Sequence, residues 1–397
     1  MVFHLSEVGP IADIKQNVKE VKAHVAKFSK PDLYLAIRTL VITAVLYAGF
    51  YAGFPYYSKN WALWSLAVFM RAGLNVRIFI IFHDCCHGNF FKSSLANMLV
   101  GRLTGSLQFT SWTGWGKVHN TDHHIHYGKD DHALVEWGAT VIWTKQEWDS
   151  YSLPRKIFLR IAKDPVLFFA FIPPFIFLLT GVHNNKMPMI DWMVPSQPKF
   201  SFTPMAPIDR VLPTLFPALQ ACTLSPCLKT QKKLLMIYAG YAMFGKSYLW
   251  FELAFNTLGS IFGFILFHWQ HYANVPNMYF GIPKDEHERD LASLMGSTFQ
   301  YVPEWYKWAT FGIEYHHIHH FSTKVPSYQL RPCHDTAPPG MWRYIKYLDF
   351  KTELQSLLLV MWNPEKHRFE SFPELNWLLG FKDTDTPAVS LKIAKEE

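Results

Sequence analysis

Eleven of the nineteen histidines in this chain lie in three short windows, at residues 83–87, 119–132 and 316–320. Neutral imidazole is the commonest metal ligand in proteins, so histidines gathered at helical spacing indicate metal binding. A single tetrahedral zinc ion takes no more than four ligands. Eight or more clustered imidazoles therefore predict a site for two metal ions.

The first and third windows each place their histidines on one face of a helix. His83 and His87 are four residues apart, and His316, His319 and His320 follow the pattern i, i+3, i+4. Side chains at these spacings are neighbours on a helix surface. We expect the first pair to face one site just beyond a membrane span, and the third group to spread far enough to reach two metals.

The middle window is less regular. His123 follows His119 by four residues, His124 by five and His126 by seven. On an ideal α-helix His124 points about 140° away from His119, whereas His126 returns to the shared face. Helical spacing alone therefore favours His119, His123 and His126 as ligands.

Other candidates lie near the windows. His268 and His271 stand at the end of the last apolar run. A lone histidine at a membrane border is usually structural, but His271 would emerge beside the windows, so we predict that it is a ligand and that His268 is not. His317 points away from the face of the third window and is expected to support a ligand or to be exposed. Glu314 is close enough in sequence to orient a ligand imidazole through its second nitrogen.

The composition indicates that the elements around these histidines span a membrane. Half of the residues are hydrophobic and only 17% are charged, against about 25% in a soluble domain. A span needs about 20 apolar residues, and long apolar runs cover 34–53, 61–82, 165–181 and 234–269. The sequence therefore predicts an integral membrane protein. No basic block is interleaved with stacking aromatics, so nucleic acid is not an expected partner.

A shared metal site limits how these runs cross the membrane, because all three windows must lie on one side. Pro173 and Pro174 interrupt the run at 165–181 and predict a hairpin that dips into the membrane without crossing it. We then expect four spans in two hairpins, the second formed by 234–269 with its turn near 246–252. The alternative is that 165–181 crosses and 234–269 is one long tilted helix.

The charge distribution predicts the orientation. Five lysines precede the first span, and positive charge there favours a cytoplasmic N-terminus. We therefore expect an all-α membrane domain at 34–340 with a cytoplasmic helical cap, a cytoplasmic segment at 1–33 and a cytoplasmic tail at 341–397. Residues 1–30 lack the apolar core of a secretory signal. The endoplasmic reticulum is the expected membrane, with Lys395 as a slight indication of a retrieval signal.

The chain resembles the membrane fatty acid desaturase superfamily, which also includes hydroxylases, acetylenases and related acyl-chain oxidases. The resemblance covers most of residues 34–335. It rests on three motifs in the same order as in that superfamily: HxxxH at 83–87, HxxxHH at 119–124 and HxxHH at 316–320. The sequence around the first and third motifs, and Val325-Pro326-Ser327-Tyr328 after the third, is most similar to the omega-6/delta-12-like branch.

The resemblance implies a non-haem diiron site, molecular oxygen as co-substrate and a fatty acyl substrate carried by lipid, CoA or ACP. The ligands that it implies are His83, His87, His119, His123, His124, His316, His319 and His320, with His271 as an additional one. It selects His124 over His126, against the helical spacing, and we follow the family. His126 then joins Asp84, Asp122 and Glu314 as a candidate to support the ligands. Phe267 stands one turn before His271, where some relatives have a polar ligand.

The same resemblance implies an external electron donor. The sequence has no haem-binding His-Pro-Gly-Gly segment, so we expect cytochrome b5 or ferredoxin, with its reductase, as a separate partner. The expected reaction removes hydrogen from two neighbouring methylenes and leaves a double bond. Hydroxylation, acetylene formation and decarboxylation use the same scaffold, and the histidine motifs do not separate them. A histidine-lined metal transporter is a competing class, but its histidines would lie within the spans.

Overall fold

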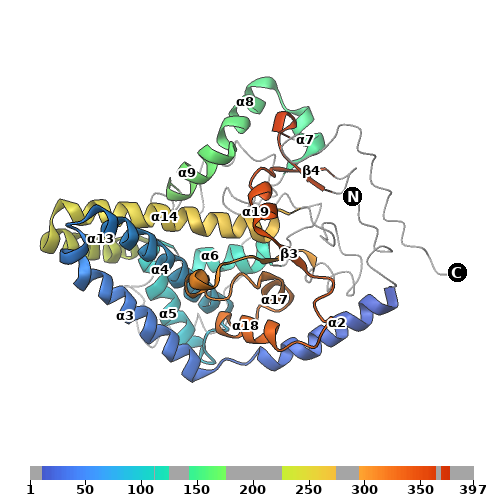
Figure 1. Cartoon of the computed structure of the whole chain (residues 1–397), viewed down its shortest axis with the longest axis horizontal. Helices are drawn as coiled ribbons and strands as arrows, with labels where there is room; N and C mark the ends of the chain where they lie inside the picture. The colour runs from blue at the N-terminus through green and yellow to red at the C-terminus, as the bar shows by residue number, and fades with distance from the viewer. Residues whose placement is uncertain are drawn as a thin grey trace.

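The structure is a computed structural model that describes residues 11–110, 112–124, 143–175, 226–273, 295–363 and 368–375. These residues are mostly helical (Figure 1). Three helices are long and apolar enough to cross a membrane: α3 (Leu33–Tyr57), α4 (Trp61–His87) and α14 (Lys246–His271). The protein is therefore a membrane protein, as the sequence predicted.

The helices α3 and α4 pack together as a hairpin. Each begins with a side-chain cap. The Asp32 carboxylate accepts a hydrogen bond from the Leu35 amide, and the side-chain carbonyl of Asn60 accepts one from the Leu63 amide. Such caps satisfy amides that have no partner within the helix. The helix α4 continues past the predicted run to His87, so its last turns carry both histidines of the first window.

A second reversal of the chain precedes α14. Gly245, with φ 72° and ψ −160°, separates α13 (Pro226–Phe244) from α14, and this conformation is open to glycine. Residues 234–269 are therefore not one continuous helix. The predicted turn at 246–252 adjoins the observed one, but these residues are helical, and Glu252 is buried in α14 and accepts a hydrogen bond of 2.6 Å from the Tyr248 hydroxyl.

Two shorter helices connect the first and middle windows. The helix α5 (Ser94–Leu107) packs along α4, and α6 (Trp112–Val118) leads to the middle window. The approach of α5 is close, since a Cβ on Gly101 would lie 3.0 Å from the Cβ of Cys85. The turn between α5 and α6 is closed by a 2.8 Å hydrogen bond from the Thr110 amide to the Gly105 carbonyl. This turn directs the chain back along α4.

Residues 143–175 form α7 (Lys145–Ser150), α8 (Leu153–Ala162) and α9 (Pro165–Phe175). The helix α9 packs on α14, with Phe168 and Phe169 against Phe264. Pro173 and Pro174 lie inside α9, just before its last described residue, Phe175. The predicted hairpin at these prolines stays a prediction. Residues 176–181 lie outside the described residues.

The layer that holds the third window includes short strands as well as helices. The helices are α16 (Lys307–Thr310), α17 (His316–Phe321), α18 (Ser327–Asp335) and α19 (Phe350–Ser356), with the 3-10 turn η4 (Glu304–Tyr306) before α16. Strand β2 (Thr298–Gln300) pairs in parallel with β3 (Lys346–Leu348). A separate sheet, with β4 (Met361–Asn363) between β1 (Trp143–Thr144) and β5 (Arg368–Glu370), packs with α7 and α8. The described part of the chain is therefore mostly helical rather than all-α, and much of the predicted tail at 341–397 packs against the rest of the protein.

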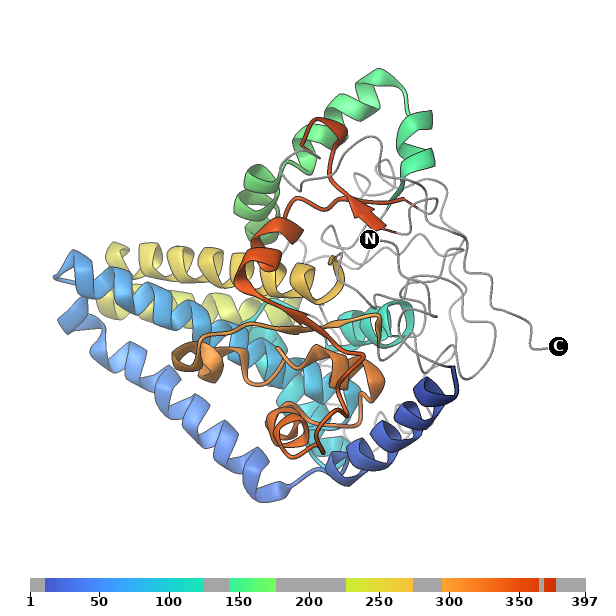
Figure 2. The same cartoon turned by 45° about the vertical axis from the view of Figure 1, so that its right-hand side comes forward.

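The N-terminal helix α2 (Ile11–Val25), followed by the 3-10 turn η1 (Ala26–Phe28), lies against the same layer (Figure 2). Val18, Val21 and Val25 of α2 belong to the apolar cluster that includes Ile318 of α17 and Leu330 of α18. Segments from both halves of the sequence thus cover the third window.

Candidate metal centre

The structure brings all nine predicted ligands into two neighbouring groups. We call the first the five-histidine cluster, made of His83, His87, His119, His124 and His319. We call the second the four-histidine cluster, made of His123, His271, His316 and His320. Within each cluster the ligand nitrogens all lie within 4.8 Å of one another. Histidines from α4, the middle window, α14 and α17 thus meet at one place.

The spacing of the nitrogens fits metal coordination. In the four-histidine cluster, the Nε2 atoms of His316 and His271 are 3.0 Å apart, as are those of His320 and His123. In the five-histidine cluster, neighbouring Nε2 atoms lie 3.1 to 3.3 Å apart. With metal–nitrogen bonds of about 2.0–2.1 Å, adjacent ligand nitrogens lie about 3.0 Å apart in an octahedron and about 3.4 Å apart in a tetrahedron. The residues present therefore fit two metal ions.

A local π-helix explains the irregular middle window. Residues His119–His123 form π-helix, and the His124 amide donates a 3.1 Å hydrogen bond to the His119 carbonyl, five residues back. A π turn is wider than an α turn, so the residue five positions on returns to the same side. His123 and His124 therefore flank the direction of His119, and each enters a different cluster. The 140° divergence predicted from an ideal α-helix does not occur.

The helix α17 also serves both clusters. Its His319 joins the five-histidine cluster, whereas His316 and His320 join the four-histidine cluster. The two clusters adjoin, since the rings of His124 and His320 have centroids 4.5 Å apart. The expectation that the third window reaches two metal positions agrees with this arrangement.

Burial keeps these imidazoles neutral. Burial lowers the pKa of His316 and His319 well below the ordinary value, and the neighbouring histidines lower it further. The same causes act on His124. Burial lowers the pKa of His320 to about 3. At neutral pH each ring therefore has a nitrogen lone pair, which is the form that binds metal.

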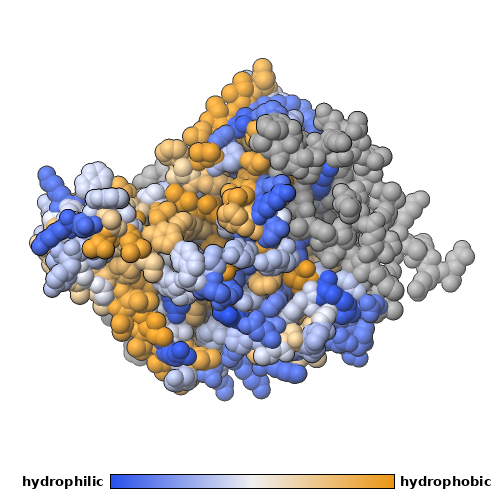
Figure 3. All heavy atoms as spheres, in the orientation of Figure 1, coloured by the Kyte–Doolittle hydropathy of each residue, from blue (hydrophilic) through white to orange (hydrophobic). Residues whose placement is uncertain are grey.

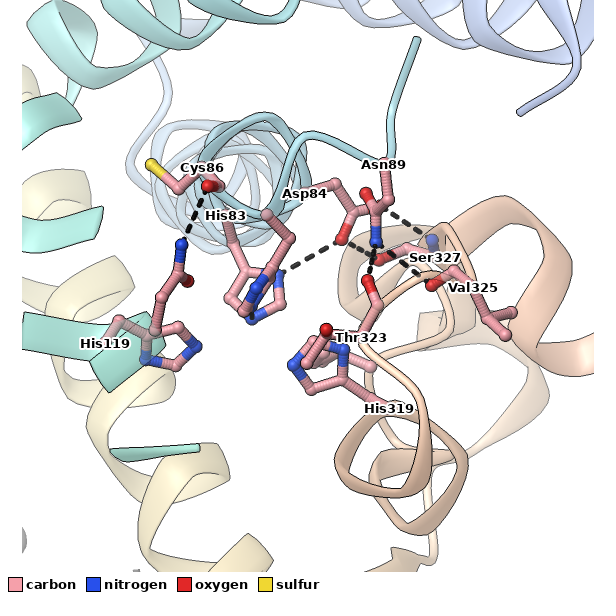
Figure 4. Close-up of polar contacts among 12 residues, drawn as sticks. His83, Asp84, Cys86, Asn89, His119, His319, Thr323, Val325 and Ser327 are labelled. Atoms are coloured by element: carbon pink, nitrogen blue, oxygen red, sulfur yellow. Dashed lines mark hydrogen bonds and ion pairs between the residues drawn. The ribbon is translucent and has the colours of Figure 1, made fainter. Parts of the chain in front are cut away.

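Asp84 connects the first window to the segment that follows the third (Figure 4). One of its carboxylate oxygens lies 3.1 Å from His83 Nδ1 and accepts a 2.9 Å hydrogen bond from the Ser327 hydroxyl. The other accepts a 2.6 Å bond from the Ser327 amide at the start of α18. Asn89 adds a second connection, because its amide donates to the carbonyls of Thr323 and Val325. A carboxylate behind a ligand imidazole fixes the ring and its tautomer.

The other predicted supporting residues do not all reach the clusters. Glu314 is buried, and burial raises the pKa of its carboxyl group. Among the described residues no hydrogen bond is seen between Glu314 and a cluster histidine. The side chain of Asp122 and the whole of His126 lie outside the described residues.

Two histidines near the clusters have other neighbours. The Nε2 atom of His317 lies 3.2 Å from His334 Nδ1. Because His317 is fully buried, the expectation that it could be exposed is wrong. His268 Nε2 lies 2.7 Å from the Ser356 carbonyl oxygen, which accepts a hydrogen bond from that nitrogen. Both therefore belong to the packing around the site.

Sequence reasoning missed some residues that hold the ligands in place. Trp115 stacks on the His119 ring, with centroids 4.1 Å apart and an interplanar angle of 16°. The amide of Asn120 donates a 3.0 Å hydrogen bond to the Cys86 carbonyl and so connects the middle window to α4. Ser327 stands in the segment that carries part of the family resemblance, but its contact with Asp84 spans 243 residues of sequence.

Comparison with known proteins gives a consistent result. The sequence model of the Fatty acid desaturase family matches residues 58–349. A protein of Bacillus subtilis (strain 168) named Fatty acid desaturase is 28% identical over 379 residues, which cover 94% of this chain and 96% of that protein.

Plant proteins match shorter stretches. An sn-2 acyl-lipid omega-3 desaturase (ferredoxin), chloroplastic, of Arabidopsis thaliana is 28% identical over 147 residues, which are 37% of this chain and 28% of that protein. An omega-3 fatty acid desaturase, endoplasmic reticulum, of Vigna radiata var. radiata is 28% identical over 116 residues, which are 29% of this chain and 30% of that protein. Both names specify omega-3 enzymes, so they do not support the omega-6/delta-12-like branch in particular. The family match over most of the chain shows that this protein belongs to the fatty acid desaturase family and is a desaturase-like oxidoreductase.

Proposed function

We propose that this protein introduces a double bond into a fatty acyl chain, using molecular oxygen and two iron ions held by the nine clustered histidines. The observation that carries the proposal is the division of these histidines into two groups whose nitrogens have the spacing of a coordination shell. The five-histidine cluster would hold one iron ion and the four-histidine cluster the other. Family membership supports the choice of substrate.

The protein contributes binding, orientation and exclusion of water. The buried imidazoles supply neutral nitrogen ligands from elements far apart in sequence. Asp84 holds the ring of His83, and Trp115 packs flat on the ring of His119. A bound iron pair, supplied with oxygen and electrons, would provide the oxidising power needed to remove hydrogen from two unactivated methylenes. The surrounding burial would keep water away from the reacting carbons.

We further propose four spans arranged as two hairpins, with α13 as the fourth span. The apolar part of α13 is Leu234–Phe244, and the whole helix of 19 residues is about 28 Å long at 1.5 Å per residue. The lysines of its first turns would then extend to the headgroup region. The reversal at Gly245 supports a hairpin with α14. If each hairpin crosses the membrane twice, α4 and α14 end on the same side of it, where His87 and His271 lie in adjoining clusters. The lysines before α3 support a cytoplasmic location for that side.

Electrons would come from a separate donor, cytochrome b5 or ferredoxin with its reductase. The Arabidopsis thaliana relative is named as a ferredoxin enzyme and as acting on sn-2 acyl-lipid, which supports ferredoxin and a lipid-linked chain here. We propose the endoplasmic reticulum as the membrane, which is the location in the name of the Vigna radiata relative. The bacterial relative makes a bacterial cytoplasmic membrane the alternative. Fluorescence imaging of the tagged chain separates these locations.

The test combines metal content with product analysis. The purified chain is expected to hold about two iron ions per molecule, and the host that produces it is expected to gain a new double bond in an existing acyl chain. A His319→Ala variant should lose both, whereas a His334→Gln variant, altered at a partly buried histidine outside the clusters, should keep both. Exchangeable zinc in place of iron would favour a transporter.

The products distinguish desaturation from related chemistry. Desaturation would be overturned if the sole new product were a hydroxy acid, an alkyne or an alkene shorter by one carbon. Such a product would still be consistent with the iron site. Activity that persists without oxygen or without an added electron donor would overturn the oxygen-dependent mechanism.

A further inference from the structure

The helices α8 and α9 together carry an exposed apolar ridge. On α8, Leu153, Ile157 and Ile161 recur every four residues and so lie on one face, and Val166 and Phe171 extend the ridge onto α9. These side chains are between 53% and 75% exposed. Figure 3 shows the apolar surface over α8 and α9 along the upper edge of the molecule, continuing toward the helical bundle. Contiguous exposed apolar surface of this kind marks a membrane or protein contact.

The opposite faces of the two helices are anchored to the protein. Leu159 of α8 is fully buried in a cluster with Trp148 and Phe372. Phe169 of α9 packs edge-on against His268 of α14, with ring centroids 5.2 Å apart. The ridge is therefore held outward by packing on its other side, and it lies next to the end of α14 that carries His271.

The direction of the two helices points to a bilayer surface. Figures 1 and 2 show α8 and α9 extending crosswise from the His271 end of α14 and away from the bundle. A helix that runs crosswise at the end of the spans lies along the membrane surface.

The charges on α8 match the headgroup region of a membrane. Its ten residues include Arg155, Lys156 and Arg160 and no acidic residue. Lys156 directly precedes Ile157, and Arg160 directly precedes Ile161. The Lys156 ammonium group donates a 3.0 Å hydrogen bond to the Asp149 carbonyl, and Arg160 pairs with Asp164, at 3.0 Å, and with Glu374. Basic residues beside an apolar stripe are typical of helices that lie in the interface of anionic membranes.

We propose that α8 and α9 form an interfacial arm whose ridge enters the lipid leaflet beside the metal centre and whose basic residues face anionic headgroups. The occupant of the ridge is therefore bilayer lipid. This inference concerns the seating of the protein in its membrane and does not depend on the reaction.

The test measures the depth of the ridge in the full-length protein. A nitroxide carried by a genetically encoded amino acid replaces Ile157 or Ile161, which leaves the native cysteines in place, and the protein is studied in nanodiscs. The control position is Lys351, which is exposed on α19 in the layer that holds the third window. Collisions with oxygen, which concentrates among acyl chains, are compared with collisions with a water-soluble nickel chelate. We expect oxygen to dominate at positions 157 and 161 and the chelate to dominate at position 351.

Two outcomes overturn the arm. Equal access of the chelate to positions 157, 161 and 351 means that the ridge faces water. Protection of 157 and 161 from both reagents means that protein covers the ridge, either another segment of the chain or a second copy.

The headgroup contact has its own measurement. Adding phosphatidylglycerol to phosphatidylcholine nanodiscs should increase the depth at position 157, and an R155Q/K156Q double variant should lose this increase. The same depth in both lipid mixtures would remove the anionic-headgroup part of the proposal.

Discussion

The two histidine clusters differ at one equivalent position. On α4, His83 and His87 are four residues apart, and both enter the five-histidine cluster. On α14 the same spacing joins Phe267 and His271, and only His271 enters the four-histidine cluster. The Phe267 ring lies 5.1 Å from the His123 ring and 5.3 Å from the His271 ring. In the proposed centre one metal ion would thus have five histidine ligands, and the other would have four with an apolar ring beside them.

The clusters also differ in their support. The five-histidine cluster has Asp84 behind His83 and Trp115 stacked on His119. Beside the four-histidine cluster, the described neighbour is the apolar ring of Phe267, which lies against His123 and His271. A ligand fixed from behind binds metal more tightly, so the five-histidine cluster is expected to hold its ion more firmly.

Removing one ligand from each cluster should have the largest effect. We expect His83→Ala and His316→Ala each to lower activity by at least about 100-fold, because losing a residue that only supports a ligand already costs about 10- to 100-fold. Each variant should lose about one iron ion and keep the other. Iron analysis and Mössbauer spectra of the purified variants check this. Full activity in His83→Ala would contradict the shared two-metal site, as would loss of both ions together with loss of membrane insertion.

The middle window gives the next largest effect, because its π turn sends neighbouring residues to different clusters. His124→Ala should lower the iron content of the five-histidine cluster, whereas His126→Ala should leave it unchanged. Iron analysis of the two single variants decides between the residues. Loss of iron only in His126→Ala would restore the assignment that ideal helical spacing favours.

These windows show what the sequence could and could not predict. The i, i+3 and i+4 spacings of the first and third windows sufficed to predict which side chains share a helix face, because those histidines lie on α-helices. For the middle window helical spacing gave the wrong direction for His124, and only the family resemblance favoured this residue. A π turn has no clear signature in the order of polar and apolar residues, since it depends on which carbonyl the His124 amide finds.

Other parts of the fold depend on contacts between distant segments. The five strands in the described part of the chain have only two or three residues each, too few for an alternating pattern to be recognised. The contact of Ser327 with Asp84 joins residues 243 positions apart. The turn at Gly245 was predicted to within a few residues, because two apolar arms needed a reversal between them. Local patterns therefore predicted the three candidate spans and the convergence of most of the clustered histidines, whereas tertiary contacts determined the residues packed behind them.

Weakening the support of the five-histidine cluster should have an intermediate effect. We expect Asp84→Asn to lower iron affinity by about 10- to 100-fold, mainly in the five-histidine cluster. Ser327→Ala should have a smaller effect, since the Ser327 amide still donates to Asp84. Glu353→Gln is the matched control, because Glu353 is another buried carboxyl group, outside both clusters. Iron retention during dialysis against a chelator measures the difference. Equal retention in Asp84→Asn and Glu353→Gln would remove Asp84 from the support of the metal.

The position of Phe267 allows the smallest change and the sharpest test of the difference between the clusters. We expect Phe267→Leu to keep two iron ions and to lower the free energy of unfolding by less than about 1.5 kcal/mol, because the side chain remains apolar and of similar size. Phe267→His would reproduce the i, i+4 pair of α4 on α14 and offer a fifth nitrogen to the four-histidine cluster. We therefore expect this variant to retain iron longer during dialysis against a chelator than Phe267→Leu does. If the two variants lose iron at the same rate, the fifth ligand on α4 does not explain a difference between the clusters, and the support from Asp84 becomes the remaining cause.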